Sequence, residues 1–337
     1  MATMADVARE AGVSVATVSR LLNNEGIVSP DTAERVYAAI QKLSYEPNLM
    51  ARNLRKNESR VILILSPNFT NPYYAHILSG IGDVAAELGY SALIFNTADN
   101  PAREREALEM LKKRRADGAI LMASDIGCSW LLEYASQYPI VQCSEYDPQV
   151  DIPHVSIDNY LATQQTMEYL IELGHKRIAI ISSENDYIST RLRLQAYKDT
   201  LAQHGITPCD GHISSASRDY SFKSGKSKAK ELLSVSPRPT AIFCISDTLA
   251  LGAITAAKEM GYRVPEDVTV IGFDDVEHTT MFHPYITTVA QPCYELGRQS
   301  AQLLYAQMTQ GKETPRQLIL EHRLIVRESS SPPAQLD

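Results

Sequence analysis

The chain of 337 residues is 44% hydrophobic, enough to fill the cores of two or three domains, and apolar runs such as Val61–Leu65 are too short to cross a bilayer. The start of the chain lacks the basic-then-apolar pattern of a signal peptide, so we expect a cytoplasmic protein. The net charge of −8 is uneven, because residues 1–60 carry 8 Lys/Arg against 7 Asp/Glu while the remainder carries 24 against 33, and nucleic acid is therefore expected to contact only a small N-terminal module.

Three short helices are predicted at the N-terminus. Thr3 and Asp6 have the spacing of a capping box, so a first helix should run from about Met4 to Ala11 and end at Gly12. Ser14 can cap a second helix that closes near Asn23-Asn24. A third helix should start at Ser29-Pro30, with Ser29 as its cap. The first two helices and their glycine-containing turn form a helix-turn-helix.

A helix-turn-helix places the start of its second helix against base edges in the major groove. Arg20 has the side chain for a bidentate contact to guanine, whereas Val15 and Ala16 offer apolar contact only. The short polar side chains nearby suit phosphate oxygens, and those expected at the DNA are Thr3, Ser14, Thr17, Ser19, Asn23 and Ser29. The alternative is a three-helix cap without a nucleic-acid role.

The whole N-terminal string resembles the headpiece of the lactose-repressor (LacI/GalR) family. The similar stretches are Asp6-Val7-Ala8, Ala11-Gly12-Val13-Ser14, Thr17-Val18-Ser19-Arg20, Val28-Ser29, Ala39-Ile40, Tyr45 and Pro47. The resemblance implies that residues 48–56 form the family's hinge helix, which folds on a palindromic operator and inserts Leu54 into the minor groove, where an apolar wedge kinks DNA. Arg52 and Lys56 would then contact DNA beside Leu54. Alternatively, Leu54 packs on the body of the protein.

From Val61 onward, short β-branched runs alternate with amphipathic stretches, which predicts βαβ units with parallel sheets. The expected strands are Val61–Leu65, Ser91–Phe95, Gly118–Met122, Ile140–Cys143, Ile178–Ile181, Ala241–Ile245, Val268–Ile271 and Gln317–Val326. The expected helices are Tyr73–Leu88, Ala102–Arg115, Leu161–Glu172, Ser189–Gln203, Phe222–Leu233 and Leu249–Met260. We therefore predict two doubly wound halves that face one another across a cleft.

Ligands of such sheets bind at the carboxyl ends of the strands. Aromatic rings, carboxylates and one arginine follow the predicted strands and suit a planar or ring-shaped polar ligand. The candidate effector residues are Tyr73, Tyr74, Asp125, Tyr187, Ser189, Arg193, Tyr220, Asp247 and Asp274. Each has a structural alternative, because Asp247 and Asp274 could be helix N-caps and Arg193 could be a surface ion-pair partner.

The body is also similar to the lactose-repressor family, in Gly174-His175-Lys176-Arg177-Ile178, Ser246-Asp247, Ile271-Gly272-Phe273-Asp274, Ile286-Thr287-Thr288-Val289 and Gln291-Pro292, among other stretches. The resemblance implies a periplasmic-binding-protein-like body in which Tyr73, Arg193, Tyr220, Asp247 and Asp274 line the effector pocket. The implied domains are a headpiece (1–47), a hinge (48–60), a first subdomain (61–158 and 291–316) and a second (159–290 and 317–337). Members of this family either release DNA or bind it more tightly when the effector binds, and the residues leave both open.

Some stretches look like the cytidine-responsive branch of the family, especially Arg191 to Tyr197 and Ala290 to Gly297. The expected effector is therefore a nucleoside, with a sugar or a purine as alternatives. Tyr187 and Ser189 depart from the Arg and Thr of purine-binding members, which argues against a purine base. The tail from Ser329 has no leucine heptads, so a homodimer that matches a palindromic operator is expected.

Other classes of protein are disfavoured. Gly80-Ile81-Gly82-Asp83-Val84-Ala85 fits a dinucleotide fingerprint but lies inside a helical pattern, and Gly225-Lys226-Ser227 lacks the first glycine of a P-loop because Tyr220 occupies its place. No GxSxG, HExxH or Cys/His cluster is present, so no enzyme activity, metal or cofactor is expected, and the five scattered cysteines should be buried thiols. A transport binding protein would begin with a signal peptide.

Overall fold

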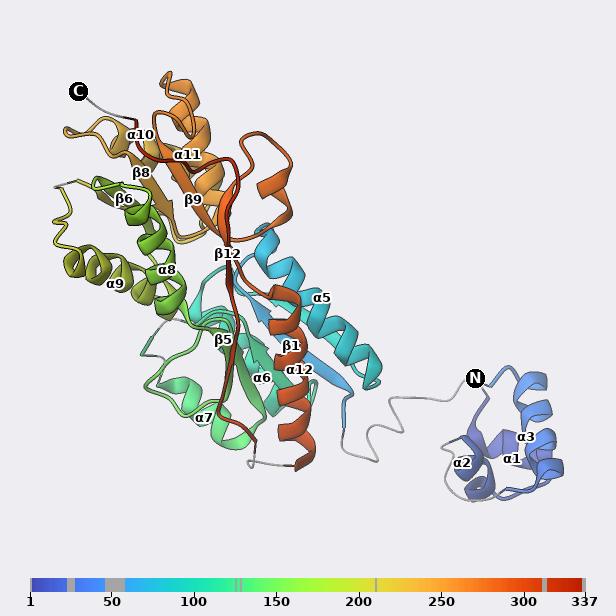
Figure 1. Ribbon diagram of the computed structural model, residues 1–337. Helices are drawn as coiled ribbons and strands as arrows, with labels where there is room; N and C mark the ends of the chain where they lie inside the picture. The colour runs from blue at the N-terminus through green and yellow to red at the C-terminus, as the bar shows by residue number, and fades with distance from the viewer. Residues whose placement is uncertain are drawn as a thin grey trace. The chain divides into compact units, whose positions relative to one another are not determined.

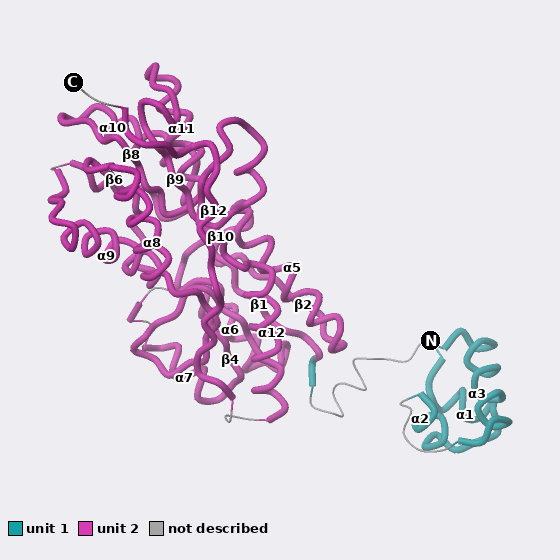
Figure 2. Tube along the Cα trace, viewed as in Figure 1, with its two compact units in different colours: residues 1–59 teal, residues 60–337 magenta. Residues whose placement is uncertain are grey.

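The computed structural model describes residues 2–22, 28–45, 58–124, 126–127, 129–209, 211–310 and 314–334. The chain divides into two compact units, residues 1–59 and 60–337, which Figure 2 shows in different colours. Each unit has its own apolar core.

The described residues of the first unit contain three helices, α1 (Met4–Ala11), α2 (Val15–Leu22) and α3 (Pro30–Lys42). The capping box predicted for α1 is present, because Thr3 Oγ1 accepts from Asp6 N at 3.3 Å and Thr3 N donates to Asp6 Oδ2 at 3.0 Å. Gly12 ends the helix with a φ of 64°, which glycine adopts without strain. Val7, Val18 and Val36 contribute one buried valine from each helix to a shared core.

The two predicted caps that follow differ in outcome. Ser14 caps α2 as expected, because its Oγ accepts from Thr17 N at 3.1 Å. Ser29 occupies the N-cap position of α3 but makes no capping bond to the backbone. Its hydroxyl instead donates to Thr32 Oγ1 at 2.8 Å, so the predicted side-chain cap is wrong. Pro30 at the first helical position supplies the start of α3.

The second unit contains two six-stranded sheets (Figure 1). The first sheet has the strand order β11-β5-β4-β3-β1-β2 and the second β12-β10-β9-β8-β6-β7. All strand pairs are parallel except β10 with β12, which is antiparallel. The strands are β1 (Val61–Ser66), β2 (Ser91–Asn96), β3 (Gly118–Leu121), β4 (Ile140–Cys143), β5 (His154–Ile157), β6 (Ile178–Ser183), β7 (Ile213–Ala216), β8 (Ala241–Cys244), β9 (Thr269–Asp274), β10 (Thr287–Ala290), β11 (Gln317–Leu320) and β12 (Arg323–Ile325).

Helices pack against both sheets. The contacts bury one apolar cluster against the second sheet and two against the first. The helices are α5 (Pro72–Glu87), α6 (Pro101–Lys112), α7 (Trp130–Gln137), α8 (Asn159–Glu172), α9 (Ile188–Gln203), α10 (Phe222–Leu233), α11 (Asp247–Glu259) and α12 (Cys293–Gln310), with a short 3₁₀ helix η1 (Glu277–Thr280). The predicted helices are all present, and Phe222–Leu233 has the predicted bounds. The sequence patterns missed α7, β5, β7 and β10, whose short lengths leave little periodicity to detect. They also missed α12, although it is 18 residues long.

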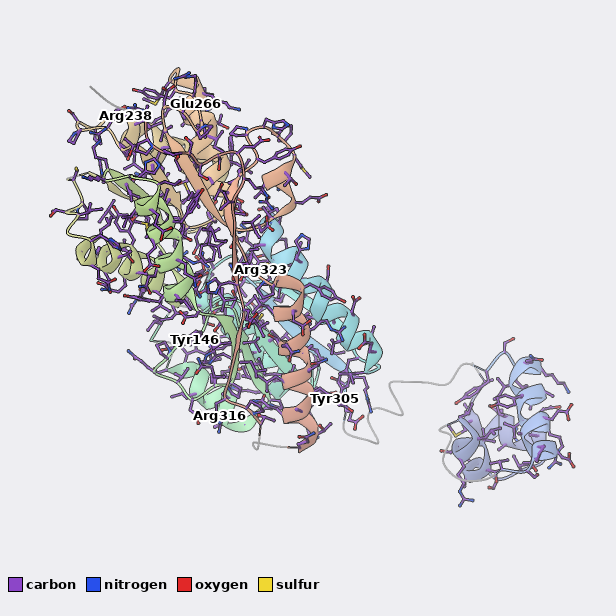
Figure 3. The ribbon with its side chains drawn as sticks, in the orientation of Figure 1. Tyr146, Arg238, Glu266, Tyr305, Arg316 and Arg323 are labelled. Atoms are coloured by element: carbon purple, nitrogen blue, oxygen red, sulfur yellow. The ribbon has the colours of Figure 1, made fainter. Side chains whose placement is uncertain are left out.

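The predicted C-terminal strand, Gln317–Val326, is two strands in different sheets. β11 pairs with β5 in the first sheet, whereas β12 pairs with β10 in the second, and Glu321-His322 carries the chain from one to the other. The expected boundary at residue 317 is therefore several residues too early. Arg323 lies between the two halves in Figure 3, while Arg316 and Arg238 lie at opposite ends of the unit. The chain crosses between the halves three times, after β5, after β10 and after β11.

Three of the cysteines, Cys143, Cys244 and Cys293, are buried free thiols. Cys209 is half-exposed, which corrects the expectation that all five are buried, and Cys128 lies outside the described residues. Within the described ranges, no helix has the length and apolar character that a membrane span requires.

Candidate functional site

The exposed face of α2 carries the side chains predicted to read DNA. Val15, Ala16 and Arg20 are exposed, while Val18 on the opposite face is fully buried in the three-helix core. Thr17 and Ser19 are half-buried, and Thr17 Oγ1 lies 2.9 Å from Ser14 Oγ. The outward face of this helix therefore offers one guanidinium, apolar groups and short hydroxyls, the mixture that major-groove reading requires.

The other predicted DNA contacts divide into two sets. Thr3, Ser14 and Ser29 are exposed at the start of the three helices, where backbone N–H groups also face outward. Asn23, Arg52, Leu54 and Lys56 lie outside the described residues.

The two halves of the second unit meet at an inner chamber whose walls come from the carboxyl ends of strands in both sheets. The free space in this chamber is only about 20 Å³, because side chains fill most of it. The lining residues are Asn71, Tyr73, Tyr74, Glu145, Ser189, Arg193, Tyr220, Ile245, Ser246, Asp274 and Gln291. Six of them, Tyr73, Tyr74, Ser189, Arg193, Tyr220 and Asp274, were predicted from the sequence.

Arg193 is buried in this chamber, so the alternative of a surface ion pair is wrong. Its guanidinium donates to Asn159 Oδ1 at 3.0 and 2.8 Å and to the carbonyl of Ile245 at 2.6 Å. It also lies 3.6 Å from the centre of the Phe273 ring, a cation–π contact. These contacts hold the guanidinium in one orientation in the wall of the chamber.

Asp274 ends strand β9, which extends three residues beyond the predicted bound of Ile271, and its φ of 117° turns the chain sharply. Its carboxyl accepts from Gln291 Nε2 at 2.8 Å and does not cap a helix. Burial raises the pKa of Asp274 to about 7, although the positive charge of Arg193 and the bond from Gln291 oppose the shift. A carboxyl in this state can accept or donate a hydrogen bond near neutral pH.

Asp247 does not line the chamber. Its fully buried carboxyl accepts from Thr288 Oγ1 at 2.6 Å and from Val276 N at 2.9 Å. The capping alternative is also wrong, because Ser246 is the N-cap of α11 and accepts from Leu249 N. Gly272 makes room for this carboxyl, since a Cβ there would lie 2.1 Å from Asp247 Oδ1. Asp247 therefore holds the loop after β9 in place behind the chamber.

A larger outer chamber of about 500 Å³ lies next to the inner one and shares Tyr74 and Tyr220 with it. Its first-half residues are Pro67, Asn68, Tyr74, Asn96, Ala98 and Asp99, and its second-half residues are Tyr187, Ser217, Arg218, Asp219 and Tyr220. Asp99 bridges the two halves, because the Tyr187 hydroxyl donates to Oδ1 and Arg218 Nε donates to Oδ2 at 2.7 Å. Tyr187 thus belongs to the outer chamber.

Sequence reasoning missed Asp99, Glu145, Arg218 and Gln291. Glu145 follows β4 and Asp99 follows β2, so the rule that polar residues after predicted strands line the cleft could have found both. Arg218 and Gln291 follow β7 and β10, two strands that the sequence patterns did not reveal. Asp125 lies outside the described residues, and in the described part of the chain no group of three His, Cys, Asp or Glu side chains could hold a metal ion.

A helix-turn-helix unit followed by a two-sheet body with a polar cleft defines the class of ligand-controlled transcription regulators. Residues 3–48 match the family model for "Bacterial regulatory proteins, lacI family", and residues 59–328 match that for "Periplasmic binding proteins and sugar binding domain of LacI family". The chain belongs to the LacI family of transcriptional repressors.

Curated relatives cover nearly the whole chain. It is 38% identical to the HTH-type transcriptional repressor CytR of Escherichia coli (strain K12), over 98% of this chain and 96% of that protein. It is 34% identical to catabolite control protein A of Priestia megaterium, over 97% and 99% of the two chains.

Solved structures agree in fold. The lac repressor dimer bound to operator and the anti-inducer ONPF has a TM-score of 0.89 at 28% identity, covering 98% of this chain and 99% of that one. The regulator CelR in complex with cellobiose has a TM-score of 0.74 at 31% identity, covering 98% and 100%. The predicted helix-turn-helix headpiece and two parallel-sheet subdomains are therefore confirmed.

Proposed function

We propose that this repressor binds a palindromic operator and is controlled by a small uncharged effector, a nucleoside such as cytidine, held between the two halves of its body. The observation that carries the proposal is the cleft formed by the two adjoining chambers. The outer chamber offers about 500 Å³ of space, and the inner chamber holds Asp274, Arg193 and Gln291 by their own hydrogen bonds beside Tyr73, Tyr74 and Tyr220. Carboxyl, amide and guanidinium groups suit the hydroxyls of a ribose, and tyrosine rings suit the face of a base.

The relatives support this choice of effector and its alternatives. CytR is similar over nearly the full length of the chain, and Tyr187 and Ser189 continue to argue against a purine base. A sugar is the second candidate, because the ribose operon repressor of Haemophilus influenzae is 33% identical over 98% of this chain and CelR is a cellobiose complex. We propose that Asp247 supports the effector site from behind, and that the predicted residues lining either chamber contact the effector. These residues are Tyr73, Tyr74, Tyr187, Ser189, Arg193, Tyr220 and Asp274.

On DNA, we propose that Arg20 reads a guanine while Val15 and Ala16 contact thymine methyl groups in the major groove. Thr3, Ser14, Thr17, Ser19, Asn23 and Ser29 are proposed phosphate contacts, and the hinge residues Arg52, Leu54 and Lys56 are proposed to enter or flank the minor groove. The protein would act in the cytoplasm, where chromosomal operators lie.

We further propose a homodimer. Each half of the body exposes apolar side chains that a second copy could cover. They are Leu93 and Ile94 on the edge strand β2 of the first half, and Phe222, Met281 and Phe282 on the second half. Exposed apolar groups on an edge strand promote pairing with another chain, and a twofold dimer matches a palindrome. The related lac repressor structure is a dimer on its operator.

Control of DNA binding would come from the angle between the two halves. An effector that bridges both halves favours one closure angle, which in a dimer changes the spacing of the segments that lead to the DNA-binding units. Coupling of this kind is typically worth about 1–3 kcal/mol, or roughly 5- to 150-fold in operator affinity.

A thermal-shift screen of nucleosides, free bases and sugars tests the effector proposal. A ligand at a hundred times its dissociation constant adds about 2.7 kcal/mol to stability, which raises the melting temperature visibly. We expect cytidine or a related nucleoside to shift the transition and to change affinity for a palindromic operator. Stabilisation by sugars alone would replace the nucleoside with a sugar, and a dimer that binds no palindrome would remove the repressor function.

A further inference from the structure

Acidic side chains outnumber basic ones in each of the two chambers. Among the described lining residues, the outer chamber has Asp99 and Asp219 against Arg218, and the inner chamber has Glu145 and Asp274 against Arg193. The two chambers together are therefore lined by four carboxyl groups and two guanidiniums. Both guanidiniums already donate hydrogen bonds to acceptors of the protein. Even with Asp274 protonated, three carboxylates remain.

Asp219 keeps its charge near neutral pH. Burial works to raise the pKa of this carboxyl, but the bonds from Ser217 and Ser221 together outweigh it and lower the pKa. Ser217 Oγ donates to Asp219 Oδ1 at 2.5 Å, and Ser221 N donates to the same atom at 3.1 Å. A negative charge thus persists on the wall of the outer chamber beside Arg218.

Asp99 controls the charge that a ligand meets in the outer chamber. Its carboxylate lies 2.7 Å from Arg218 Nε, so it neutralises the guanidinium that could otherwise pair with a phosphoryl group. The Tyr187 hydroxyl bonds to the other oxygen and fixes the carboxylate in that place.

Building on the proposed function, we propose that the cleft selects an unphosphorylated ring ligand against its phosphate ester, and that Asp99 is the specificity-determining residue. A phosphate that carries nearly two negative charges would face a surplus of carboxylates in a site with low-dielectric walls, where repulsion is stronger than in water. The effector is accordingly the unphosphorylated form of the metabolite. A kinase that phosphorylates it would therefore remove the effector from the repressor.

The substitution Asp99→Asn isolates this charge. Asp99 has a φ of 57°, a left-handed conformation that Asn tolerates as readily as Asp. The Asn side-chain oxygen can still accept from the Tyr187 hydroxyl or from Arg218, so the shape of the bridge is retained. Asp267→Asn is the matched control, because Asp267 also pairs with an arginine, Arg263, at 2.9 Å. Asp267 comes directly after Glu266, which Figure 3 places at the outer end of the second half, away from the cleft.

Calorimetric titration of the full-length protein with two matched pairs tests the proposal. The pairs are cytidine with cytidine 5′-monophosphate and ribose with ribose 5-phosphate. At least one of the two pairs should bind. For that pair, wild type and D267N should bind the neutral ligand at least about tenfold more tightly than its phosphate ester. In D99N this ratio of affinities should be about tenfold smaller. Equal affinity for both members in wild type, or an unchanged ratio in D99N, would overturn the proposal.

A second measurement separates this inference from the choice of effector. Inorganic phosphate should raise the melting temperature of D99N and leave wild type and D267N unmoved, whatever organic ligand the cleft takes. If neutral ligands fail to bind but phosphate still distinguishes D99N from wild type, the nucleoside proposal fails and the role of Asp99 stands. If phosphate acts equally on all three proteins, the role of Asp99 fails on its own.

Discussion

Ser189 and Glu145 join the two halves of the body across the cleft. Ser189, the second residue of α9, donates from Oγ to Glu145 Oε1 at 2.5 Å and from its backbone N to Oε2 at 3.1 Å. Glu145 follows β4 in the first half, so both of its carboxylate oxygens are held by the start of a helix in the second half. The helix N-terminus stabilises a negative charge there, and opening of the cleft must separate the two residues.

We expect Ser189→Ala to weaken effector binding. The variant loses the hydroxyl bond to a charged acceptor, an interaction worth about 1.5–3 kcal/mol, while the backbone bond remains. If the closed form binds the effector, its dissociation constant should rise at least about tenfold in calorimetric titration. Ser234→Ala is the control, because the Ser234 hydroxyl donates to Lys230 O at 2.8 Å at the exposed end of α10. Equal affinities in the two variants would show that this bridge does not contribute to closure.

Asp274 should make the stability of the body depend on pH. Burial raises the folded-state pKa of this carboxyl to about 7 from a usual value of 3.8, so the folded protein binds its proton more tightly than the unfolded chain does. The stabilisation from this proton is complete below about pH 4 and is lost as pH rises through about 7. Thermal unfolding from pH 4 to 8 should therefore show wild type losing stability relative to Asp274→Asn, by a difference on the order of 1 kcal/mol or more.

The same variant should bind effector more weakly while binding operator normally, because Asn cannot supply a carboxylate to a ligand hydroxyl. Parallel pH profiles for wild type and D274N would contradict the buried-carboxyl account, and an unaltered effector titration would move the binding site elsewhere.

Local chemistry made much of the fold predictable. Thr3 with Asp6 marked the start of α1, and polar residues after apolar strands marked Tyr73, Arg193 and Asp274 as cleft residues. Contacts between distant segments were not predictable in this way. Asp99 meets Arg218 only because two sheets face one another, and Asp247 turns away from the chamber because Thr288 and Val276 N bind it. The split between β11 and β12 likewise depends on which sheet edge each segment meets.

Two glycines of α5, Gly80 and Gly82, should respond oppositely to substitution. A Cβ on Gly80 would lie 2.0 Å from the carbonyl oxygen of Tyr294 in α12, whereas a Cβ on Gly82 would meet nothing within 4 Å. Gly80→Ala should therefore cost about 1–3 kcal/mol or more through overpacking. Gly82→Ala should be neutral or stabilising by up to about 1 kcal/mol, because Gly is a poor helix former. Urea unfolding followed by circular dichroism measures both, and similar midpoints would show that α5 and α12 do not pack this closely.

Arg20→Ala should relax the choice of base at one position of each operator half-site. The Arg20 side chain is exposed on α2, where a bidentate contact to guanine contributes about 1–3 kcal/mol of discrimination against other bases. Competition binding with single-base variants of a selected palindrome, at one fixed salt concentration, measures that discrimination. Arg35→Ala on the exposed face of α3 removes the same charge from the unit and should leave the base preferences intact. If Arg20→Ala instead weakens binding to every operator variant equally, Arg20 does not read a base and binds phosphate. Another side chain of α2 must then carry the specificity.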